Sequence, residues 1–290
     1  MVDCTRRLLL PFVLTVVAGC GPSGGSAPNS TPQPPTPLAT KYNPATAGTI
    51  QGQVRWQGVI PKTAPDLAPV PTTTSFEWQE KSNPYEPRVD GETHGLADAV
   101  VYLAGVDPAA SKPWDWPDVR IELRDFRIDV RQGHGDARRV GVVRRGAEVE
   151  IVSEDSAYHM LRARGAAFFT LPFPEPNKPL TRRLDNAGLV ELTSGAGYFW
   201  TAADLFVSEH PYYAITDATG RYTLAGVPPG TYDLVCWVRD WNVTGKDRDP
   251  ETGLVFRQHY AAPYEQRVRV TVPDGETNFT INATRFHSPR

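Results

Sequence analysis

The chain lacks an excess of charge of either sign and has no long basic run. Its 290 residues carry 30 lysines and arginines against 33 aspartates and glutamates, for a net charge of −3. A balance this close to neutral provides no general attraction to nucleic acid, so we expect no nucleic-acid partner. Six arginines occur as adjacent pairs, which we interpret as solvated charge balanced by nearby carboxylates. The arginines are Arg138, Arg139, Arg144, Arg145, Arg182 and Arg183, and the carboxylates are Glu148, Glu150, Glu154 and Asp155.

Catalytic and zinc-binding patterns are also missing. There is no Gly-x-Ser-x-Gly elbow, no phosphate-binding loop and no cysteine placed as a nucleophile. Adjacent carboxylates such as Glu154 and Asp155 point to opposite faces of a strand and cannot act as an acid–base pair. The histidines at positions 94, 134, 210, 259 and 287 have none of the usual zinc-ligand spacings. We therefore expect neither enzymatic activity nor zinc.

No stretch keeps an apolar period of 3.6 residues, so long helices are not predicted. From Gly48 onward, short runs of β-branched and aromatic residues are separated by Gly, Pro, Asn and Asp, which predicts a nearly all-β chain. Residues 60–95 form a Pro-rich insertion. Val119, Ile121 and Leu123 alternate as in a strand, and the phase then shifts by one to Phe126, Ile128 and Val130, which indicates a β-bulge near Arg124-Asp125. Residues 268–281 predict a final hairpin. Other strands are expected at residues 49–57, 99–103, 141–143, 149–152, 158–162, 189–193 and 198–207.

The first twenty residues have the organisation of a secretory signal. A pair of arginines precedes an apolar run at residues 8–18, which is shorter than the roughly 20 residues that span a bilayer. The sequence VAGC at residues 17–20 resembles a bacterial lipobox, which implies cleavage before Cys20 and attachment of membrane lipid to its sulfur. Gly21 replaces the Asp of the inner-membrane retention signal. The resemblance therefore implies a lipid anchor in the bacterial cell envelope, in the outer membrane or at the cell surface rather than in the inner membrane.

Residues 21–47 contain seven prolines among Ser, Thr, Gly and Asn, with almost no large apolar residue. Such a composition cannot bury a core, and it predicts a disordered tether. At about 3.1 Å per residue, the tether reaches on the order of 80 Å. After cleavage Cys236 would be the one cysteine without lipid, so we expect no intrachain disulfide.

Residues 210–237, HPYYAITDATGRYTLAGVPPGTYDLVCW, contain two strand-like runs and two tight turns. Asp217 can cap the first turn, Gly220 supplies a positive φ, and the VPPG corner at residues 227–230 leads into a buried strand. This run resembles the carboxypeptidase regulatory-domain-like (transthyretin-like) β-sandwich, a family of mostly non-catalytic accessory or binding modules. The resemblance implies such a domain at residues 208–286.

Residues 142–161, VVRRGAEVEIVSEDSAYHML, resemble the cupredoxin strand pair that delivers the first copper-binding histidine, here His159. The resemblance implies a cupredoxin-like domain at residues 48–207. The family's later Cys, His and Met ligands align with three residues that are not soft ligands, namely Gly195, Tyr198 and Thr201. We interpret the domain as degenerate and without copper, and His159 as a hydrogen-bonding or packing residue. The predicted fold class is all-β, with two Greek-key β-sandwich domains after the signal and tether.

One calcium-like pattern follows the buried strand. The order of an EF-hand calcium loop is reproduced by Asp240, Asn242, Thr244 and Glu251. The segment before it reads as a strand rather than a helix, so the alternatives are a calcium loop between strands and a solvated acidic turn. Residues 241–263 are expected to form a long ordered excursion.

Aromatic side chains are the remaining lead to a ligand. Trp114 and Trp116 lie in a predicted exposed loop, where flat rings suit sugars or peptides, although such rings also fill cores. With His159, they are the candidate ligand-binding residues. We predict a non-enzymatic binding or scaffold lipoprotein without a cofactor, with membrane lipid through Cys20 and a cell-surface glycan or envelope protein as partners. The alternatives are a carbohydrate-binding module, with or without calcium, and a relic cupredoxin-type electron-transfer protein.

Overall fold

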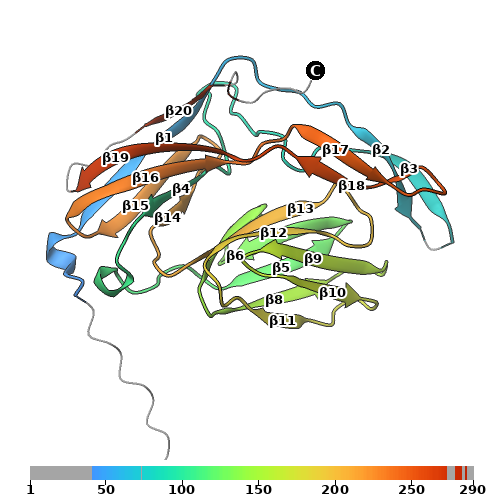
Figure 1. The fold of residues 1–290 in the computed structure, drawn as a ribbon, viewed down its shortest axis with the longest axis horizontal. Helices are drawn as coiled ribbons and strands as arrows, with labels where there is room; N and C mark the ends of the chain where they lie inside the picture. Colours follow the sequence, from blue (N-terminus) through green and yellow to red (C-terminus); the bar gives the residue numbers. More distant parts are fainter. Residues whose placement is uncertain (1–40, 73, 273–277, 283–284, 286–290) are drawn as a thin grey trace, which may run out of the picture. The chain divides into compact units, whose positions relative to one another are not determined.

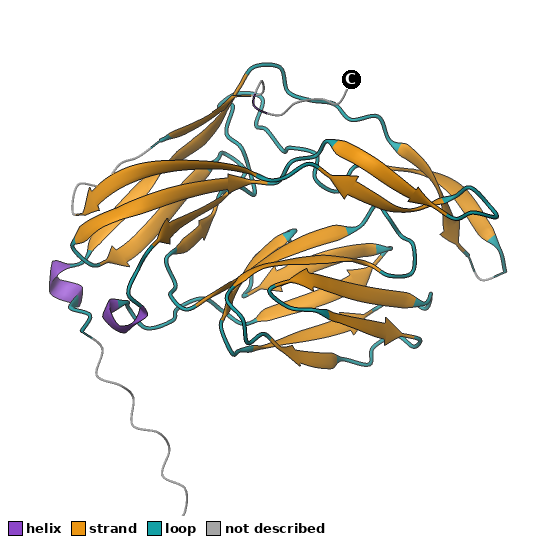
Figure 2. Cartoon of the chain, in the orientation of Figure 1, coloured by secondary structure: helices purple, strands orange, loops and turns teal. Residues whose placement is uncertain are grey.

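The computed structural model describes residues 41–72, 74–272, 278–282 and 285. The signal at residues 1–20 with Cys20, and the tether up to residue 40, lie outside the described residues. The described chain is built of strands, with two short 3-10 turns, η1 (Pro44–Thr46) and η2 (Pro108–Ala110) (Figures 1 and 2). This confirms the all-β prediction. None of the described helices is long and apolar enough to cross a membrane.

Two sheets that share one apolar core form the outer sandwich. One sheet has the order β15-β1-β20, and the other has the order β14-β4-β16-β19. Buried Ile50 and Val54 of one sheet pack with Leu103 and Leu234 of the other. The strands are β1 (Gly48–Gln57), β4 (Val100–Ala104), β14 (Tyr213–Ile215), β15 (Arg221–Val227), β16 (Gly230–Val238), β19 (Tyr264–Val272) and β20 (Phe279–Asn282).

The inserted sandwich lies in the sequence between β4 and β14. Its sheets have the orders β10-β9-β12-β13-β7 and β11-β8-β5-β6. They enclose a second core that includes Ile121, Ile151, Leu192 and Leu205. The strands are β5 (Val119–Arg124), β6 (Arg127–Gln132), β7 (Val140–Arg144), β8 (Glu148–Ser153), β9 (His159–Gly165), β10 (Phe169–Phe173), β11 (Leu180–Arg183), β12 (Gly188–Ser194) and β13 (Ala202–Ser208).

The predicted assignment of β1 and β4 to the first domain is wrong. Strands β1 and β4 fall within the expected first domain at residues 48–207, yet β1 pairs with β15 and β4 pairs with β14 and β16. The alternating apolar residues of these strands complete the outer core, which the later strands leave open. One sandwich is therefore inserted into the other, whereas the sequence analysis placed the two in series.

One predicted local feature is confirmed and another is corrected. The turn at Asp217 to Gly220 is confirmed, because the Asp217 carboxylate accepts the backbone N–H groups of Thr219 and Arg221 and Gly220 has φ +77°. The bulge expected at Arg124-Asp125 is instead a two-residue hairpin turn. Asp125 and Phe126 have φ of +50° and +56° between β5 and β6, as in a type I′ turn. The shift in apolar phase comes from that reversal of the chain.

The expected final hairpin at residues 268–281 is also wrong. Strand β19 pairs with β16, whereas β20 pairs in parallel with β1 in the opposite sheet. The Pro-Asp-Gly turn at residues 273–275 lies outside the described residues. The chain therefore passes from one sheet of the outer sandwich to the other, and a short linker does not by itself make a hairpin.

Two further hairpins extend from the outer sandwich. One is β2 (Asp66–Pro71) with β3 (Phe76–Lys81), from the Pro-rich insertion. The other is β17 (Val243–Arg248) with β18 (Val255–Tyr260), which gives the expected excursion at residues 241–263 its structure. Asp66 joins the two hairpins by accepting from Lys246 and Gln258, at 2.6 Å each.

Candidate functional site

His159, at the start of β9, belongs to a buried hydrogen-bond cluster. Its Nε2 lies 2.8 Å from Oδ2 of Asp155, and the same carboxylate accepts the backbone N–H groups of Asp125 and Phe126. Burial lowers the pKa of His159, and the hydrogen bond that its ring donates to the Asp155 carboxylate opposes that shift. The side chain is 3% exposed. His159 therefore fastens the β5–β6 turn through Asp155, and its ring is not open to a ligand.

The space beside His159 is filled by aromatic rings. The Tyr198 ring lies 5.3 Å from the His159 ring and 5.0 Å from that of Phe126, and the Trp200 ring lies 5.4 Å from Tyr198. The Tyr198 hydroxyl donates to the Tyr158 carbonyl at 2.8 Å. A Cβ on Gly195 would approach the Met160 sulfur to 2.8 Å. The position at which a cupredoxin would hold its metal is thus packed core.

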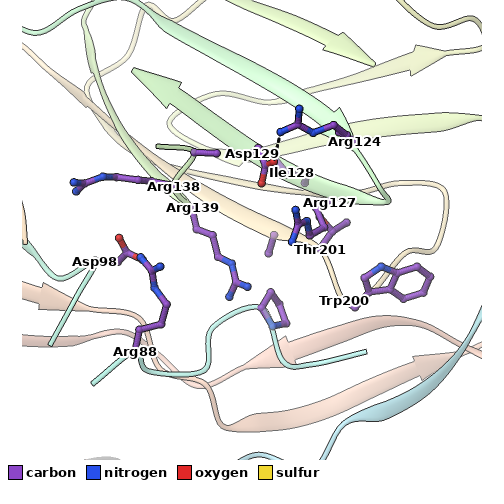
Figure 3. A pocket seen from close by; sticks show the side chains of 13 residues that line it. Arg88, Asp98, Arg124, Arg127, Ile128, Asp129, Arg138, Arg139, Trp200 and Thr201 are labelled. Atoms are coloured by element: carbon purple, nitrogen blue, oxygen red, sulfur yellow. Dashed lines mark hydrogen bonds and ion pairs between the residues drawn. The ribbon is translucent and has the colours of Figure 1, made fainter. Parts of the chain in front are cut away.

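Thr201 does not join this core, because it lies at the rim of a cavity of about 260 Å³ (Figure 3). Five arginines and two aspartates line that cavity together with Trp200 and Ala202. The charged residues come from three places: the loop between β3 and β4, the β5–β6 hairpin, and the residues before β7. They are Arg88, Asp98, Arg124, Arg127, Asp129, Arg138 and Arg139.

The arginines are only partly balanced. Arg88 pairs with Asp98, and Arg124 lies 3.5 Å from both Asp129 and Glu154. Among the described residues, no carboxylate lies within ion-pair distance of the other three. The side chains of two of these, Arg127 and Arg139, make no hydrogen bond to another described residue. The third side chain, that of Arg138, reaches two backbone carbonyls only at 3.4 and 3.5 Å.

Positive charge is crowded at this site. Burial lowers the pKa of Arg139 against the attraction of Asp98, and Arg88 and Arg127 add repulsion. Burial also lowers the pKa of Lys81, again with a contribution from Arg127, and the Lys81 ammonium lies over the Trp200 ring. Guanidinium groups stay charged in proteins, so the cavity holds uncompensated positive charge.

The Thr201 hydroxyl adds an unsatisfied polar atom. Thr201 is 6% exposed, and its Oγ1 has no hydrogen-bond partner in the described protein. A buried hydroxyl without a partner is costly, so Thr201 is a locally destabilising feature of the cavity wall.

The sequence analysis missed this site. Two of the arginine pairs do form ion pairs with carboxylates, since Arg145 pairs with Glu209 and Arg183 with Asp185, although neither partner is one of the predicted carboxylates. Arg138 and Arg139 do not, and that part of the prediction is wrong. The available signal was the placement of Arg124 and Arg127 on either side of a tight turn, but only the bridge between Val130 and Arg138 brings the two segments together.

A buried acid–base network borders the arginine cavity. Asp204 of β13 is 1% exposed, donates its backbone N–H to the Arg139 carbonyl at 2.8 Å, and leaves Oδ1 without a partner. The Nε of Arg239 is 3.8 Å from Asp204 Oδ2, while Nη2 of Arg239 donates to Glu191 at 2.6 Å. Burial raises the pKa of Asp204 to about 7, against the opposing effect of Arg239.

The two predicted ligand-binding tryptophans, Trp114 and Trp116, lie in different surroundings. Trp116 is half-buried, donates from Nε1 to the Pro211 carbonyl at 3.0 Å, and lines a cavity of about 240 Å³ with Tyr212 and Tyr213. Trp114 is also half-buried but does not line that cavity. The loop is therefore less exposed than predicted, and Trp116, but not Trp114, lines a cavity.

The calcium-like residues do not form a loop. Asn242 donates both its backbone and side-chain N–H to Oδ1 of Asp240, at 2.8 Å each, while Thr244 lies on β17. Glu251 lies in the turn beyond that strand. A strand of six residues rises roughly 20 Å. Glu251 therefore cannot meet Asp240, and the EF-hand interpretation is wrong. Among the described residues, no three His, Cys, Asp or Glu side chains are grouped to hold a metal.

Comparisons with known proteins give a limited result. No protein-family model matches the chain, and no curated protein is significantly similar to it. Among solved structures, the chain is similar to a copper(I) structure of an amicyanin mutant, with 10% identity and a TM-score of 0.26 over 37% of this chain and 98% of amicyanin. A reduced amicyanin mutant at pH 4 gives the same values, and another copper(I) mutant gives a TM-score of 0.25. Likeness at this level carries no argument about function.

Proposed function

We propose that the protein is a non-enzymatic binding protein that holds an anionic ligand in the arginine-lined cavity. The observation that carries the proposal is that Arg127 and Arg139 line one cavity and neither has a carboxylate partner among the described residues. Uncompensated guanidinium groups are suited to bidentate recognition of carboxylate, phosphate or sulfate.

In this proposal the rest of the chain positions the cavity. The lipobox-like signal places lipid on Cys20 and holds the protein at the bacterial cell envelope, and the Pro-rich tether carries the folded part away from the membrane. The inserted sandwich is a degenerate cupredoxin-like domain, and the outer sandwich is a carboxypeptidase regulatory-like module. What supports the absence of copper transfer is the packed core beside His159.

Thermal unfolding of the full chain in low salt tests the proposal. A ligand that binds only the folded state stabilises it by about 2.7 kcal/mol at a hundred times its Kd, so a binding anion raises Tm. We expect that rise for the wild type and its loss in the double variant Arg127→Gln, Arg139→Gln. The matched control is Arg269→Gln, which removes an exposed arginine on β19. Equal shifts in the control and the double variant would contradict the proposal.

A carbohydrate-binding role is the second candidate, because Trp116, Tyr212 and Tyr213 line a cavity of their own. Aromatic faces beside polar groups are suited to neutral sugars. Binding to a glycan array that disappears in Trp116→Ala and persists in Trp114→Ala would favour this role. An identical signal from both variants would count against it.

A further inference from the structure

A second, smaller cavity adjoins the arginine cavity and contains Asp204 in its lining. Its volume is about 60 Å³. Ala202 of β13 lines the arginine cavity, and Asp204 lies two positions further along the same strand, on the same face. Four residues line both cavities: Pro84, Arg88, Asp98 and Arg139. An anion held beside Arg139 and a charge on Asp204 are therefore neighbours.

The carboxylate of Asp204 lies beside a second carboxylate of the same sheet. Asp204 and Glu191 are directly opposite partners on the antiparallel strands β13 and β12. Side chains in directly opposite positions share one face of the sheet, and like charges there are destabilising. Two ionised carboxylates at this position therefore need a cation to compensate them.

Arg239, which follows β16, is shared unequally by the two carboxylates. Its Nη2 donates to Glu191 at 2.6 Å, whereas its Nε lies 3.8 Å from Asp204 Oδ2, beyond hydrogen-bond distance. Neither Arg239 Nε nor Asp204 Oδ1 has a hydrogen-bond partner among the described residues. An ionised Asp204 is thus a buried charge without a hydrogen-bonded cation in the described part of the chain, which is costly.

A proton on Asp204 removes that cost. Burial raises the pKa of Asp204 to about 7, with Arg239 opposing the shift and Glu191 adding to it. The charged and titratable groups around Asp204 come from the β3–β4 loop, the residues before β7, strand β12 and the residues after β16. They are Tyr85, Glu86, Arg88, Asp98, Arg139, Glu191 and Arg239. Arginines stay charged, and burial raises the pKa of Tyr85 well above its ordinary value, so neither group supplies this proton near neutral pH.

A bound anion and an ionised Asp204 repel each other, because both are negative and Arg139 lines both cavities. The anion therefore favours the protonated form of Asp204, and by reciprocity the proton favours the anion. Below pH 7 the proton is already in place and anion binding is strongest. Above pH 7 binding has to take up a proton from solvent, so the affinity for the anion falls as the pH rises.

We propose that anion binding in the arginine cavity is coupled to proton uptake by Asp204, so that the anion is held at low pH and released as the pH rises. This inference rests on the proposed function, which names only the anion site, and it assigns the regulation of that site. Asp204 is a regulatory residue here and does not touch the anion.

Calorimetric titration of the full chain with acetate and with sulfate, at pH 6 and 8.5 and constant ionic strength, tests the coupling. Both anions keep their charge over this range, so a change in affinity belongs to the protein. We expect binding to be about five- to tenfold weaker at pH 8.5, as for a coupling of one pKa unit. Titrations at pH 7.5 in two buffers of different ionisation enthalpy count the protons, and we expect net uptake on binding.

Two variants assign the proton to Asp204. Asp204→Asn cannot ionise, so it is expected to bind both anions with the same affinity at the two pH values and without proton uptake. Glu191→Gln removes the opposite carboxylate and frees Arg239 for Asp204, so the fall in affinity is expected at lower pH than in the wild type. Asp233→Asn, which removes an exposed carboxylate, is the control and keeps the wild-type behaviour. Far-UV circular dichroism shows that each variant is folded.

The failures of the two proposals are distinguishable. Absence of binding of both anions at both pH values would overturn the anion-binding function and the coupling together. Equal affinity at pH 6 and 8.5, or binding without proton uptake, would overturn the coupling and leave the anion-binding function intact. A pH dependence that persists unchanged in Asp204→Asn would also overturn the coupling, because another group would then carry the proton.

Discussion

Two regions of the inserted sandwich meet at residues 198–201, and they differ in what they enclose. On one side the Tyr198 ring packs against His159 and Phe126 and fills the space between them. On the other, Thr201 borders a hollow lined by arginines. The first region carries the recognisable motif and is filled, whereas the second matches no motif and is open. A family motif indicates how a chain folds, and only the packing decides whether the site is still accessible.

Truncation of the Tyr198 side chain, in the filled region, gives the largest expected loss of stability. Tyr198→Ala is expected to lower the free energy of unfolding by about 3–5 kcal/mol, as for other large aromatic residues in a core, because it leaves a void between His159, Phe126 and Trp200. Tyr198→Phe keeps the ring and loses only the hydrogen bond to Tyr158, for about 1 kcal/mol. Urea denaturation measures both values. A loss below about 1 kcal/mol for the alanine variant would mean that the ring is not core.

The buried carboxylate beside the cavity is expected to make stability depend on pH. The pKa of Asp204 rises from 3.8 unfolded to about 7 in the folded state. The folded state therefore binds a proton that the unfolded state has released, and stability is highest below pH 4 for this group and falls as pH rises through 7. The full difference is about 4 kcal/mol.

Asp204→Asn removes this pH dependence. We expect the gain in stability of the variant over the wild type to be greatest near pH 8 and to shrink toward pH 4, as followed by urea denaturation across that range. Asp233→Asn, which removes an exposed carboxylate paired with Arg269, is the control. A constant difference between wild type and Asp204→Asn at every pH would contradict the assignment.

Removal of an unpaired arginine is expected to stabilise the ligand-free protein. Arg139→Gln removes a buried charge whose desolvation outweighs its attraction to Asp98, so Tm of the ligand-free protein rises. Arg120→Gln is the matched comparison, because Arg120 pairs with Glu150 and Glu122, and its loss lowers stability by about 0.2–1 kcal/mol. A lower Tm for Arg139→Gln than for Arg120→Gln would show that Arg139 is an ordinary surface charge.

Metal addition gives the smallest expected effect. Neither copper(II) nor calcium is expected to change Tm, because the space at His159 is filled and the calcium-like residues are separated by β17. Differential scanning fluorimetry with equimolar copper, or with millimolar calcium, measures this. A stabilisation lost in His159→Gln would restore a metal role for the filled region, and one lost in Asp240→Asn would do so for the β17 segment.

Much of the local structure could be predicted from the sequence. The alternation of Val119, Ile121 and Leu123 predicted a strand, and Asp217 with Gly220 predicted a tight turn. Such features depend on residues close in the chain. The arginine cavity could not be predicted, because Arg88, Arg127 and Arg139 come from three separated segments, and nothing local to each distinguishes it from a solvated charge.

The sequence by itself determined that this chain is made of strands, that a tight turn falls at Asp217 to Gly220, and that positions 195, 198 and 201 carry no soft ligand atom. Alternation, turn chemistry and residue identity act over a few positions. The tertiary structure alone decided that β1 and β4 complete the later sandwich and that arginines from three separate segments line one cavity. Pairing between distant strands and the packing of the space between them depend on the free energy of the whole fold, which no short segment specifies.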